Sequence, residues 1–170
     1  MKLFVDTADL GEIEALVPLG IIDGVTTNPS LLAKVGNDPR GVLKGICELV
    51  KGPVSAEVVA TDCDGMVREG RELAAIDSHI VVKVPFGKAG VQACRILTNE
   101  GVRVNVTLIF SASQALLAAK VGAAFVSPFV GRLDDIGTPG MDLIRTIVEI
   151  FENFEFSTEV LVASTRGPMH

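Results

Sequence analysis

The sequence predicts an α/β fold built from repeated βα units around a parallel barrel. Three observations lead to this prediction. Short apolar runs alternate with longer stretches of helical period along the 170 residues. The short runs are almost continuously apolar, which is typical of parallel strands that are buried on both faces. Each run also ends at or near a polar residue, and in parallel barrels the chemistry gathers at the carboxyl ends of the strands.

Seven segments are predicted to be strands. Each is rich in Val, Ile or Leu and is short enough to be a strand rather than a helix. In chain order they are Leu3–Asp6, Gly24–Asn28, Val54–Val59, His79–Val84, Val102–Leu108, Ala123–Pro128 and Glu159–Ser164.

Six segments between these strands have the period of a helix. They are Ala8–Leu19, Pro39–Lys51, Asp62–Ile76, Lys88–Glu100, Ser111–Val121 and Thr138–Asn153. Start and stop signals support several of them. Ser111 and Asp62 or Asp64 are suited to N-caps, and Ser30 is expected to cap the helix that follows the second strand. Gly101 and Gly122 fall where helices are expected to end.

The alternation amounts to seven βα units, whereas a TIM (β/α)8 barrel needs eight. We therefore expect a TIM-type barrel truncated after the seventh strand, forming a single domain over residues 1–170 that lacks the eighth unit. An open doubly wound sheet is the competing fold. Its Gly-rich turn after the first strand is missing from Asp6-Thr7-Ala8-Asp9-Leu10. Unpaired edges on the first and last strands predict a homo-oligomer or a poorly stable chain.

The composition argues against several classes of function. A formal charge of −6 and a pI near 4.9, without a cluster of Lys and Arg, do not suit a nucleic-acid binder. Cys47, Cys63 and Cys94 are far apart and are expected to be buried or half-buried side chains, not a disulfide framework. With only two histidines, no metal site is expected. No leader or membrane-spanning run is visible, so we expect a cytoplasmic protein.

Lys83 is the strongest single signal for chemistry. The segment Ile80-Val81-Val82-Lys83-Val84-Pro85 places an amine among bulky hydrocarbon side chains. Desolvation disfavours the charged form of a lysine and leaves more free amine to attack a carbonyl carbon and form an iminium. The alternative is a lysine that reaches water at the barrel rim or pairs with a carboxylate.

Polar residues that close other strands add candidate groups. Asp6 is placed to exchange protons with a substrate hydroxyl, or else to cap a helix. Asn28 suits hydroxyl binding, or else a plain turn. Glu57 lies in an apolar strand and needs a partner, for which Thr107, through a water molecule, and an ion pair with Lys83 are the alternatives.

Two arginines follow the sixth and seventh strands. Arg132 and Arg166 are placed to hold a phosphate group with bidentate guanidinium contacts, helped by the hydroxyls of Ser127 and Ser164. The alternative for Arg132 is a surface ion pair with the carboxylates of Asp134–Asp135.

Five motifs in chain order resemble the transaldolase family, and more closely its small transaldolase-like subgroup, which includes the fructose-6-phosphate aldolases. They are Phe4-Val5-Asp6-Thr7-Ala8, Gly24-Val25-Thr26-Thr27-Asn28-Pro29-Ser30, Val82-Lys83-Val84-Pro85, Asn105-Val106-Thr107-Leu108-Ile109-Phe110-Ser111 and Ser127-Pro128-Phe129-Val130-Gly131-Arg132. The match spans nearly the whole chain. Five ordered motifs are far more specific than a single glycine-rich loop.

The resemblance implies a role for each strand-end residue. Lys83 forms the Schiff base, Asp6 is the general acid and base, and Glu57 and Thr107 position the catalytic water. The groups that bind the hydroxyls and the phosphate of the substrate are Asn28, Asn105, Ser127, Arg132, Ser164 and Arg166.

The implied activity is that of a class I transaldolase without a metal or organic cofactor. Such an enzyme moves a dihydroxyacetone unit from fructose 6-phosphate to erythrose 4-phosphate in the pentose phosphate pathway. Fructose-6-phosphate aldolase is the alternative activity. The resemblance implies that the aldolases of this subgroup carry Gln and Tyr at the positions of Glu57 and Phe129. The residues found here therefore favour transaldolase.

Members of the family continue beyond the position of His170 with an eighth strand and a terminal helix that packs on a neighbouring subunit, in pentamers or decamers. This chain is therefore expected to lack both elements. An alternative of another class is a catalytically inactive truncated barrel that only binds sugar phosphate.

Overall fold

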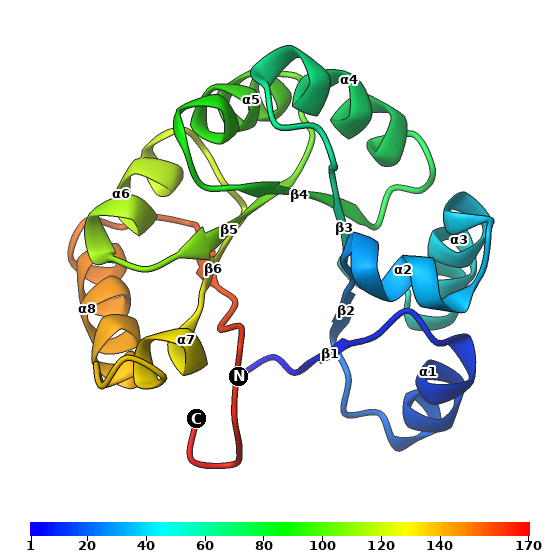
Figure 1. Cartoon of the computed structure of the whole chain (residues 1–170), viewed down its shortest axis with the longest axis horizontal. Coiled ribbons are helices and arrows are strands. Elements are labelled where there is room, and N and C mark those ends of the chain that lie inside the picture. The colour runs from blue at the N-terminus through cyan, green and yellow to red at the C-terminus, as the bar shows by residue number, and fades with distance from the viewer. The chain divides into compact units, whose positions relative to one another are not determined.

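The computed structural model describes residues 1–170 and is an alternation of strands and helices (Figure 1). The strands are β1 (Phe4–Asp6), β2 (Gly24–Thr26), β3 (Val54–Glu57), β4 (Ile80–Pro85), β5 (Val104–Ile109), β6 (Phe125–Pro128) and β7 (Glu159–Val160). The helices are α1 (Leu10–Leu16), the 3-10 helix η1 (Val17–Leu19), α2 (Pro29–Val35), α3 (Pro39–Val50), α4 (Cys63–Ala74), α5 (Lys88–Asn99), α6 (Ala112–Lys120), α7 (Val130–Asp134) and α8 (Gly140–Asn153).

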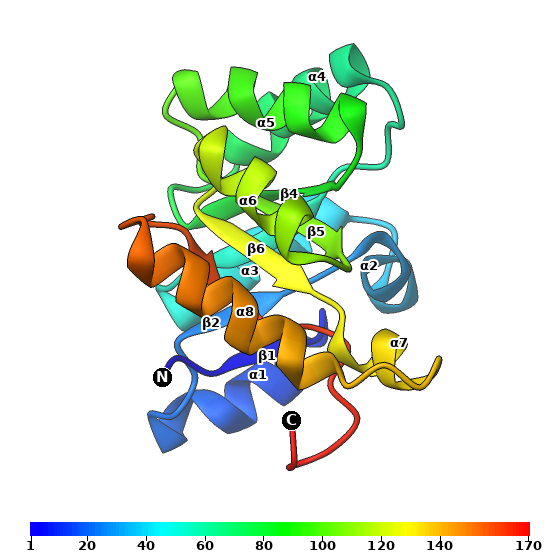
Figure 2. The same cartoon turned by 90° about the vertical axis from the view of Figure 1, so that its left-hand side faces the viewer.

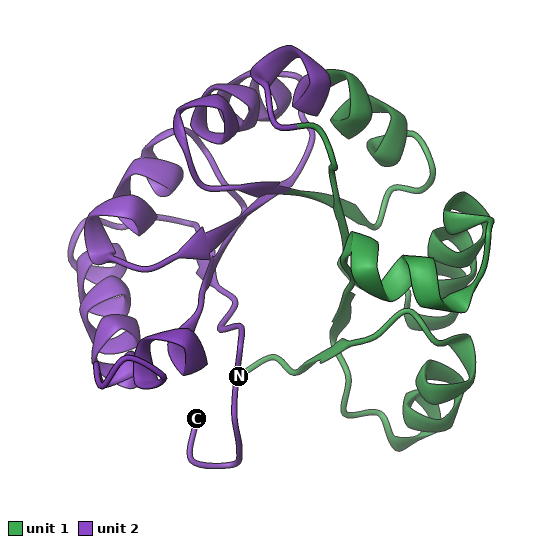
Figure 3. Cartoon of the chain, viewed as in Figure 1, with its two compact units in different colours: residues 1–60, 68–83 green, residues 61–67, 84–170 purple.

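The chain divides into two compact units (Figure 3). Unit 1 consists of residues 1–60 and 68–83, and unit 2 consists of residues 61–67 and 84–170. Unit 1 contains β1, β2, β3 and the part of β4 that carries Lys83, whereas unit 2 contains β5, β6 and β7. The single-domain organisation expected from the sequence stays a prediction.

Unit 1 is a layer of parallel strands with helices packed against it. β1 pairs with β2, β2 with β3, and β3 with β4. Val25 and Val54 are fully buried, and Leu43 and Ile46 of α3 are buried as well. At the start of β2, a Cβ on Gly24 would lie 2.6 Å from the carbonyl oxygen of Pro53, so only glycine allows this close approach of the two chain segments.

Unit 2 repeats this arrangement with β5, β6 and β7, which are paired in parallel. Figure 2 shows α6 and α8 side by side outside these strands. Val106, Val126 and Ile147 form part of its core and are fully buried. The β5–β6 register shifts between Val106 and Ile109, and within this irregular stretch Leu108 adopts a φ of 59°.

The predicted fold class is confirmed. The strands follow one another in chain order from β1 to β7, and a helix follows each of β1 to β6. This is the α/β topology of a TIM-type barrel with seven of its eight strands. The continuous apolar runs form parallel strands that are covered by helices. Such strands do not show the alternation of apolar and polar residues that marks a strand with one face in water.

The structure also differs from the expectations at several element ends. Two short helices, α2 and α7, lie outside the six segments of helical period, although a helix capped by Ser30 was expected after the second strand. Ser30 does not cap α2, because the cap is Asn28, whose side-chain oxygen accepts a hydrogen bond from the backbone N–H of Leu31 at 3.0 Å. Pro29 then occupies the first turn of α2, where its missing N–H costs nothing. None of the helices combines the length and the apolar character that crossing a membrane requires.

Candidate active site

Lys83 lies on β4 between fully buried valines and is itself only 8% exposed. The register of β3 and β4 places Glu57 directly opposite Lys83. Their charged groups form an ion pair, with 3.1 Å between Nζ of Lys83 and Oε2 of Glu57. The ion pair that the sequence left open as an alternative is therefore present. It places a carboxylate beside the one buried lysine of the chain.

A second acceptor holds the same amine. Nζ of Lys83 donates a hydrogen bond to the backbone carbonyl oxygen of Thr27 at 2.5 Å. Thr27 follows β2 directly and is fully buried. Both its backbone N–H and its hydroxyl donate to the carbonyl oxygen of Ser55 on β3, at 3.0 and 2.8 Å. The lysine amine is thus held by groups from two neighbouring segments of unit 1.

Asp6 is the last residue of β1, and its side chain is exposed. One of its carboxylate oxygens accepts a hydrogen bond from the hydroxyl of Thr26 at 2.7 Å. The alternative role of Asp6 as a helix cap is wrong. Asp9 caps α1 instead, and its side chain accepts from the N–H groups of Gly11 and Glu12. The Asp6 carboxylate therefore remains a candidate for proton exchange.

Asn28 follows the end of β2, and its side-chain oxygen is used by the cap of α2. Its amide NH2 is the part of the side chain that can donate to a substrate hydroxyl. Asn28 is thus the cap of a helix and not a plain turn residue, and its binding of a substrate hydroxyl stays a prediction.

In unit 2, three polar residues are buried on β5 and β6. Asn105, Thr107 and Ser127 are 0%, 3% and 3% exposed. The hydroxyl of Ser127 donates to the side-chain oxygen of Asn105 at 3.0 Å, which links the two strands. The water bridge predicted between Thr107 and Glu57 stays a prediction.

Phe129 begins the turn into α7 and lies between an aromatic ring and a cation. Its ring centroid is 5.9 Å from that of Phe110, and the guanidinium carbon of Arg132 is also 5.9 Å from the Phe129 ring. The second contact has the geometry of a cation–π interaction. The ion pair that was the alternative for Arg132 is made by Arg166 instead, which pairs with Asp135.

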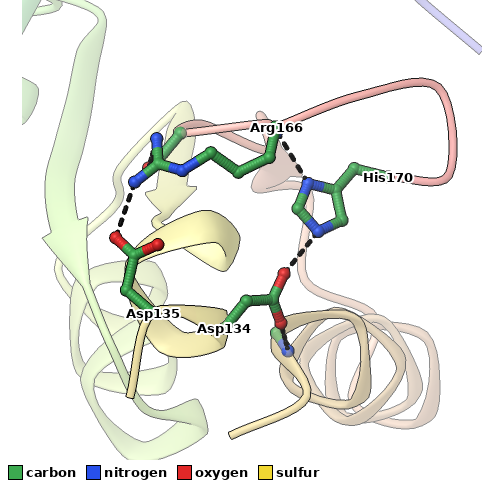
Figure 4. A network of polar contacts seen from close by, with 6 residues as sticks. Asp134, Asp135, Arg166 and His170 are labelled. Atoms are coloured by element: carbon green, nitrogen blue, oxygen red, sulfur yellow. Dashed lines mark hydrogen bonds and ion pairs between the residues drawn. The ribbon is translucent and has the colours of Figure 1, made fainter. Parts of the chain in front are cut away.

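Arg166 belongs to a network of ion pairs and hydrogen bonds (Figure 4). Its guanidinium donates to Oδ2 of Asp135 at 2.7 Å, and its backbone N–H donates to Nδ1 of His170 at 2.9 Å. The other ring nitrogen of His170 is 2.5 Å from a carboxylate oxygen of Asp134. The N–H of Gly140 and, after it, the His170 ring hold the pKa of Asp134 below its ordinary value. Sequence reasoning missed Asp135 as a partner of Arg166.

The chain segment around Ser164 approaches α7 very closely. The N–H of Gly131 donates to the carbonyl oxygen of Ser164 at 2.9 Å, and a Cβ at position 131 would lie 2.1 Å from that oxygen. Ser164 has a φ of 59°, in the left-handed region that residues other than glycine rarely adopt. Its hydroxyl accepts from the Arg166 guanidinium at 3.3 Å. Strained backbone of this kind clusters at ligand-binding sites.

The cysteines are as expected from the sequence. Cys47 and Cys94 are buried, and Cys63 is half-buried. Burial raises the pKa of Cys47 to about 11 and that of Cys94 to about 12, so both thiols are protonated at neutral pH and are poor nucleophiles. The lysine is therefore the more suitable nucleophile in unit 1.

The strands of this TIM-type α/β fold carry a buried amine, carboxylates and hydroxyls, a set of groups that suits an aldolase-type enzyme. A family model described as transaldolase/fructose-6-phosphate aldolase matches residues 3–170. The chain belongs to this family.

Individual relatives agree with the family model. A probable transaldolase of Jannaschia sp. (strain CCS1) is 61% identical over 170 residues, which are 100% of this chain and 78% of the relative. A probable transaldolase of Rhodospirillum centenum (strain ATCC 51521 / SW) is also 61% identical, covering 100% of this chain and 74% of the relative. A third probable transaldolase, from Clostridium perfringens (strain 13 / Type A), is 56% identical, and the match covers 100% of this chain and 79% of the relative. The resemblance recognised from the five motifs is confirmed.

Proposed function

We propose that this chain is a class I transaldolase in which Lys83 forms a Schiff base with a ketose phosphate. The observation that carries the proposal is the buried amine of Lys83, paired with Glu57 at 3.1 Å. The donor is fructose 6-phosphate and the acceptor is erythrose 4-phosphate, which places the reaction in the pentose phosphate pathway. A cytoplasmic location and a homo-oligomeric state stay predictions.

The reaction begins when the ammonium group of Lys83 loses a proton and the resulting free amine attacks the C2 ketone of the donor; the proton returns when the ketone oxygen leaves. Loss of the ketone oxygen as water leaves an iminium, which withdraws electrons from the C3–C4 bond. Asp6 takes the proton of the C4 hydroxyl as this bond breaks, and an aldose phosphate leaves. Asn28 and Asn105 hold the hydroxyls of the three-carbon unit that stays attached. This unit is an enamine, and its carbon attacks the aldehyde of the second aldose phosphate, while Asp6 returns its proton to the oxygen that becomes the new C4 hydroxyl. Addition of water to the resulting iminium then releases the seven-carbon ketose phosphate and frees Lys83.

Transfer competes with release of free dihydroxyacetone, which is the reaction of an aldolase. Release requires that the enamine be protonated by a water molecule. Phe129 carries no hydroxyl to direct such a water, and its ring is occupied by Phe110 and Arg132. The absence of a hydroxyl at position 129 supports transaldolase over fructose-6-phosphate aldolase. A glutamate in place of a glutamine at position 57 supports it as well, with Thr107 as the other proposed ligand of the catalytic water.

Sodium borohydride reduction in the presence of fructose 6-phosphate tests the proposal. We expect a mass adduct that peptide mapping locates on Lys83, and no adduct when the sugar or the borohydride is omitted. In a separate reaction without borohydride, fructose 6-phosphate and erythrose 4-phosphate are expected to yield the seven-carbon ketose phosphate. Free dihydroxyacetone as the main product would indicate an aldolase. Absence of any adduct, with sugar phosphate still bound, would indicate a protein that only binds its ligand.

The phosphate of the substrate is proposed to bind to Arg132 and Arg166 with the hydroxyls of Ser127 and Ser164. In the ligand-free chain the Arg166 guanidinium is paired with Asp135, and both side chains are about half exposed. A phosphate that binds Arg166 has to compete with this carboxylate.

Substitution Asp135→Asn is therefore expected to lower KM for fructose 6-phosphate about two- to fivefold, the range that corresponds to an exposed ion pair. KM for unphosphorylated fructose is expected to stay unchanged. Steady-state kinetics with both sugars measures the difference. The matched control is Asp142→Asn, which removes an exposed carboxylate paired with Arg145 on α8 and changes the net charge equally. An unchanged KM, or the same change for both sugars, would contradict the competition.

A further inference from the structure

The carbonyl group of Thr27 is held in place more firmly than a strand end requires. Two donors of the same residue, the backbone N–H and the hydroxyl, bind one acceptor, the carbonyl oxygen of Ser55. Thr27 and Ser55 are 0% and 1% exposed, so water does not compete for these groups. The double attachment fixes Thr27 through its backbone N–H and its side chain, and the carbonyl oxygen of the same residue accepts from Nζ of Lys83 at 2.5 Å.

The amine loses hydrogens during the proposed reaction. The ammonium group of a lysine has three, and Lys83 directs them at two acceptors, Thr27 and Glu57. When an ammonium condenses with a ketone, two hydrogens leave with the ketone oxygen as water. The product is an iminium with one N–H, and its positive charge equals that of the starting ammonium. This single N–H can be directed at one acceptor only.

We propose that Thr27 is a positioning residue for the Schiff base, because its carbonyl oxygen accepts the one remaining N–H of the iminium. The inference rests on the proposed function of Lys83. Two observations favour Thr27 over Glu57 as the acceptor. The distance to the carbonyl is 2.5 Å against 3.1 Å to the carboxylate. The carbonyl is also fixed by Ser55, whereas the carboxylate ends a side chain that is 20% exposed and can turn toward water.

This arrangement divides two tasks between the two acceptors. A hydrogen bond from the N–H stabilises the protonated iminium relative to the neutral imine. The protonated form is the one that withdraws electrons from the breaking bond. Glu57 loses its contact with the nitrogen at the same step, and its carboxylate becomes available to bind the water molecule that forms or is consumed there. The hydroxyl of Thr27 contributes indirectly, through the orientation of its own carbonyl.

Substitutions Thr27→Val and Thr27→Ser separate this role from simple packing. Valine has nearly the volume of threonine but no hydroxyl, so it removes the side-chain bond to Ser55 and leaves the backbone bond in place. Serine keeps the hydroxyl and loses the methyl group. For Thr27→Val we expect kcat to fall about tenfold while KM for fructose 6-phosphate changes less than twofold, because a misplaced acceptor affects the reacting group and not the binding of the sugar. Thr27→Ser is expected to restore most of the lost kcat.

The pH dependence of borohydride trapping is a second measurement. A change in packing alone is not expected to alter it. Borohydride reduces the protonated iminium, so trapping declines at high pH. For Thr27→Val we expect this decline to shift to lower pH by about one pH unit. The decline in Thr27→Ser is expected to match that of the unsubstituted chain. Thermal unfolding establishes that each variant is folded at the assay temperature. If Thr27→Val does not fold, Thr27→Cys, whose thiol is a weak donor, is measured with the same expected direction.

The inference is overturned if Thr27→Val retains the unsubstituted pH profile of trapping, or if Thr27→Ser loses as much kcat as Thr27→Val. Failure of the proposed function has a different signature. In that case the unsubstituted chain itself forms no adduct with fructose 6-phosphate, and the comparison of the Thr27 variants shows no trapping at any pH.

Discussion

Substitution Lys83→Met is expected to lower the rate of sugar transfer by about four orders of magnitude or more, because it removes the nucleophile of a covalent mechanism. Methionine is unbranched and of similar length, so it can occupy the apolar position on β4 between Val82 and Val84. The measurement is the formation of the seven-carbon ketose phosphate from fructose 6-phosphate and erythrose 4-phosphate. The same variant is expected to form no borohydride adduct.

The interpretation requires that the variant be folded. Lys83→Met leaves the carboxylate of Glu57 without its cation, and removing one partner of a buried pair destabilises a protein. Glu57 is partly exposed and can turn toward water, so a lower unfolding temperature is expected but not loss of the fold. Lys120→Met, at the exposed end of α6, is the matched control and is expected to keep its activity. Undiminished transfer by Lys83→Met would overturn the proposed function.

The strands and long helices of this fold were predictable because the chain is locally consistent. Ser111, for example, forms the capping box with Gln114 at the start of α6, and Gly101 and Gly122 adopt the positive φ values of helix ends, 83° and 91°. The two short helices α2 and α7 are seven and five residues long. Segments of that length make at most two turns. They are too short to show the repeated spacing of apolar residues by which a helix is recognised in a sequence.

The candidate site was predictable where a polar residue interrupts an apolar strand. Lys83 and Glu57 stand out in the sequence for this reason, but their pairing depends on the register of β3 and β4, which the sequence does not contain. Thr27 was missed as a partner of Lys83, because it acts through its backbone carbonyl and every residue has one. Asp135 was missed as a partner of Arg166 because the two residues are 31 positions apart in the chain.

The second large effect is expected for Asp6→Asn, which interrupts a later step than Lys83→Met. The amide oxygen of asparagine can still accept the hydrogen bond that Thr26 donates to Asp6 at 2.7 Å, so the local structure is expected to persist. An amide cannot take up the proton of the C4 hydroxyl. Loss of a general base lowers the rate about 10²- to 10⁴-fold. Lys83 is unchanged, so the Schiff base with fructose 6-phosphate is still expected to form.

The mass of the trapped adduct distinguishes the two steps. The unsubstituted chain is expected to carry mainly the three-carbon unit that remains after cleavage, whereas Asp6→Asn is expected to carry the intact six-carbon sugar phosphate. Asp9→Asn is the matched control, because asparagine caps a helix as well as aspartate does, and both its activity and its adduct are expected to be unchanged. A three-carbon adduct on Asp6→Asn, formed at the unsubstituted rate, would show that another group removes the proton. Loss of every adduct would instead show that Asp6 is needed for the formation of the Schiff base. Cleavage follows that step and requires the covalent complex.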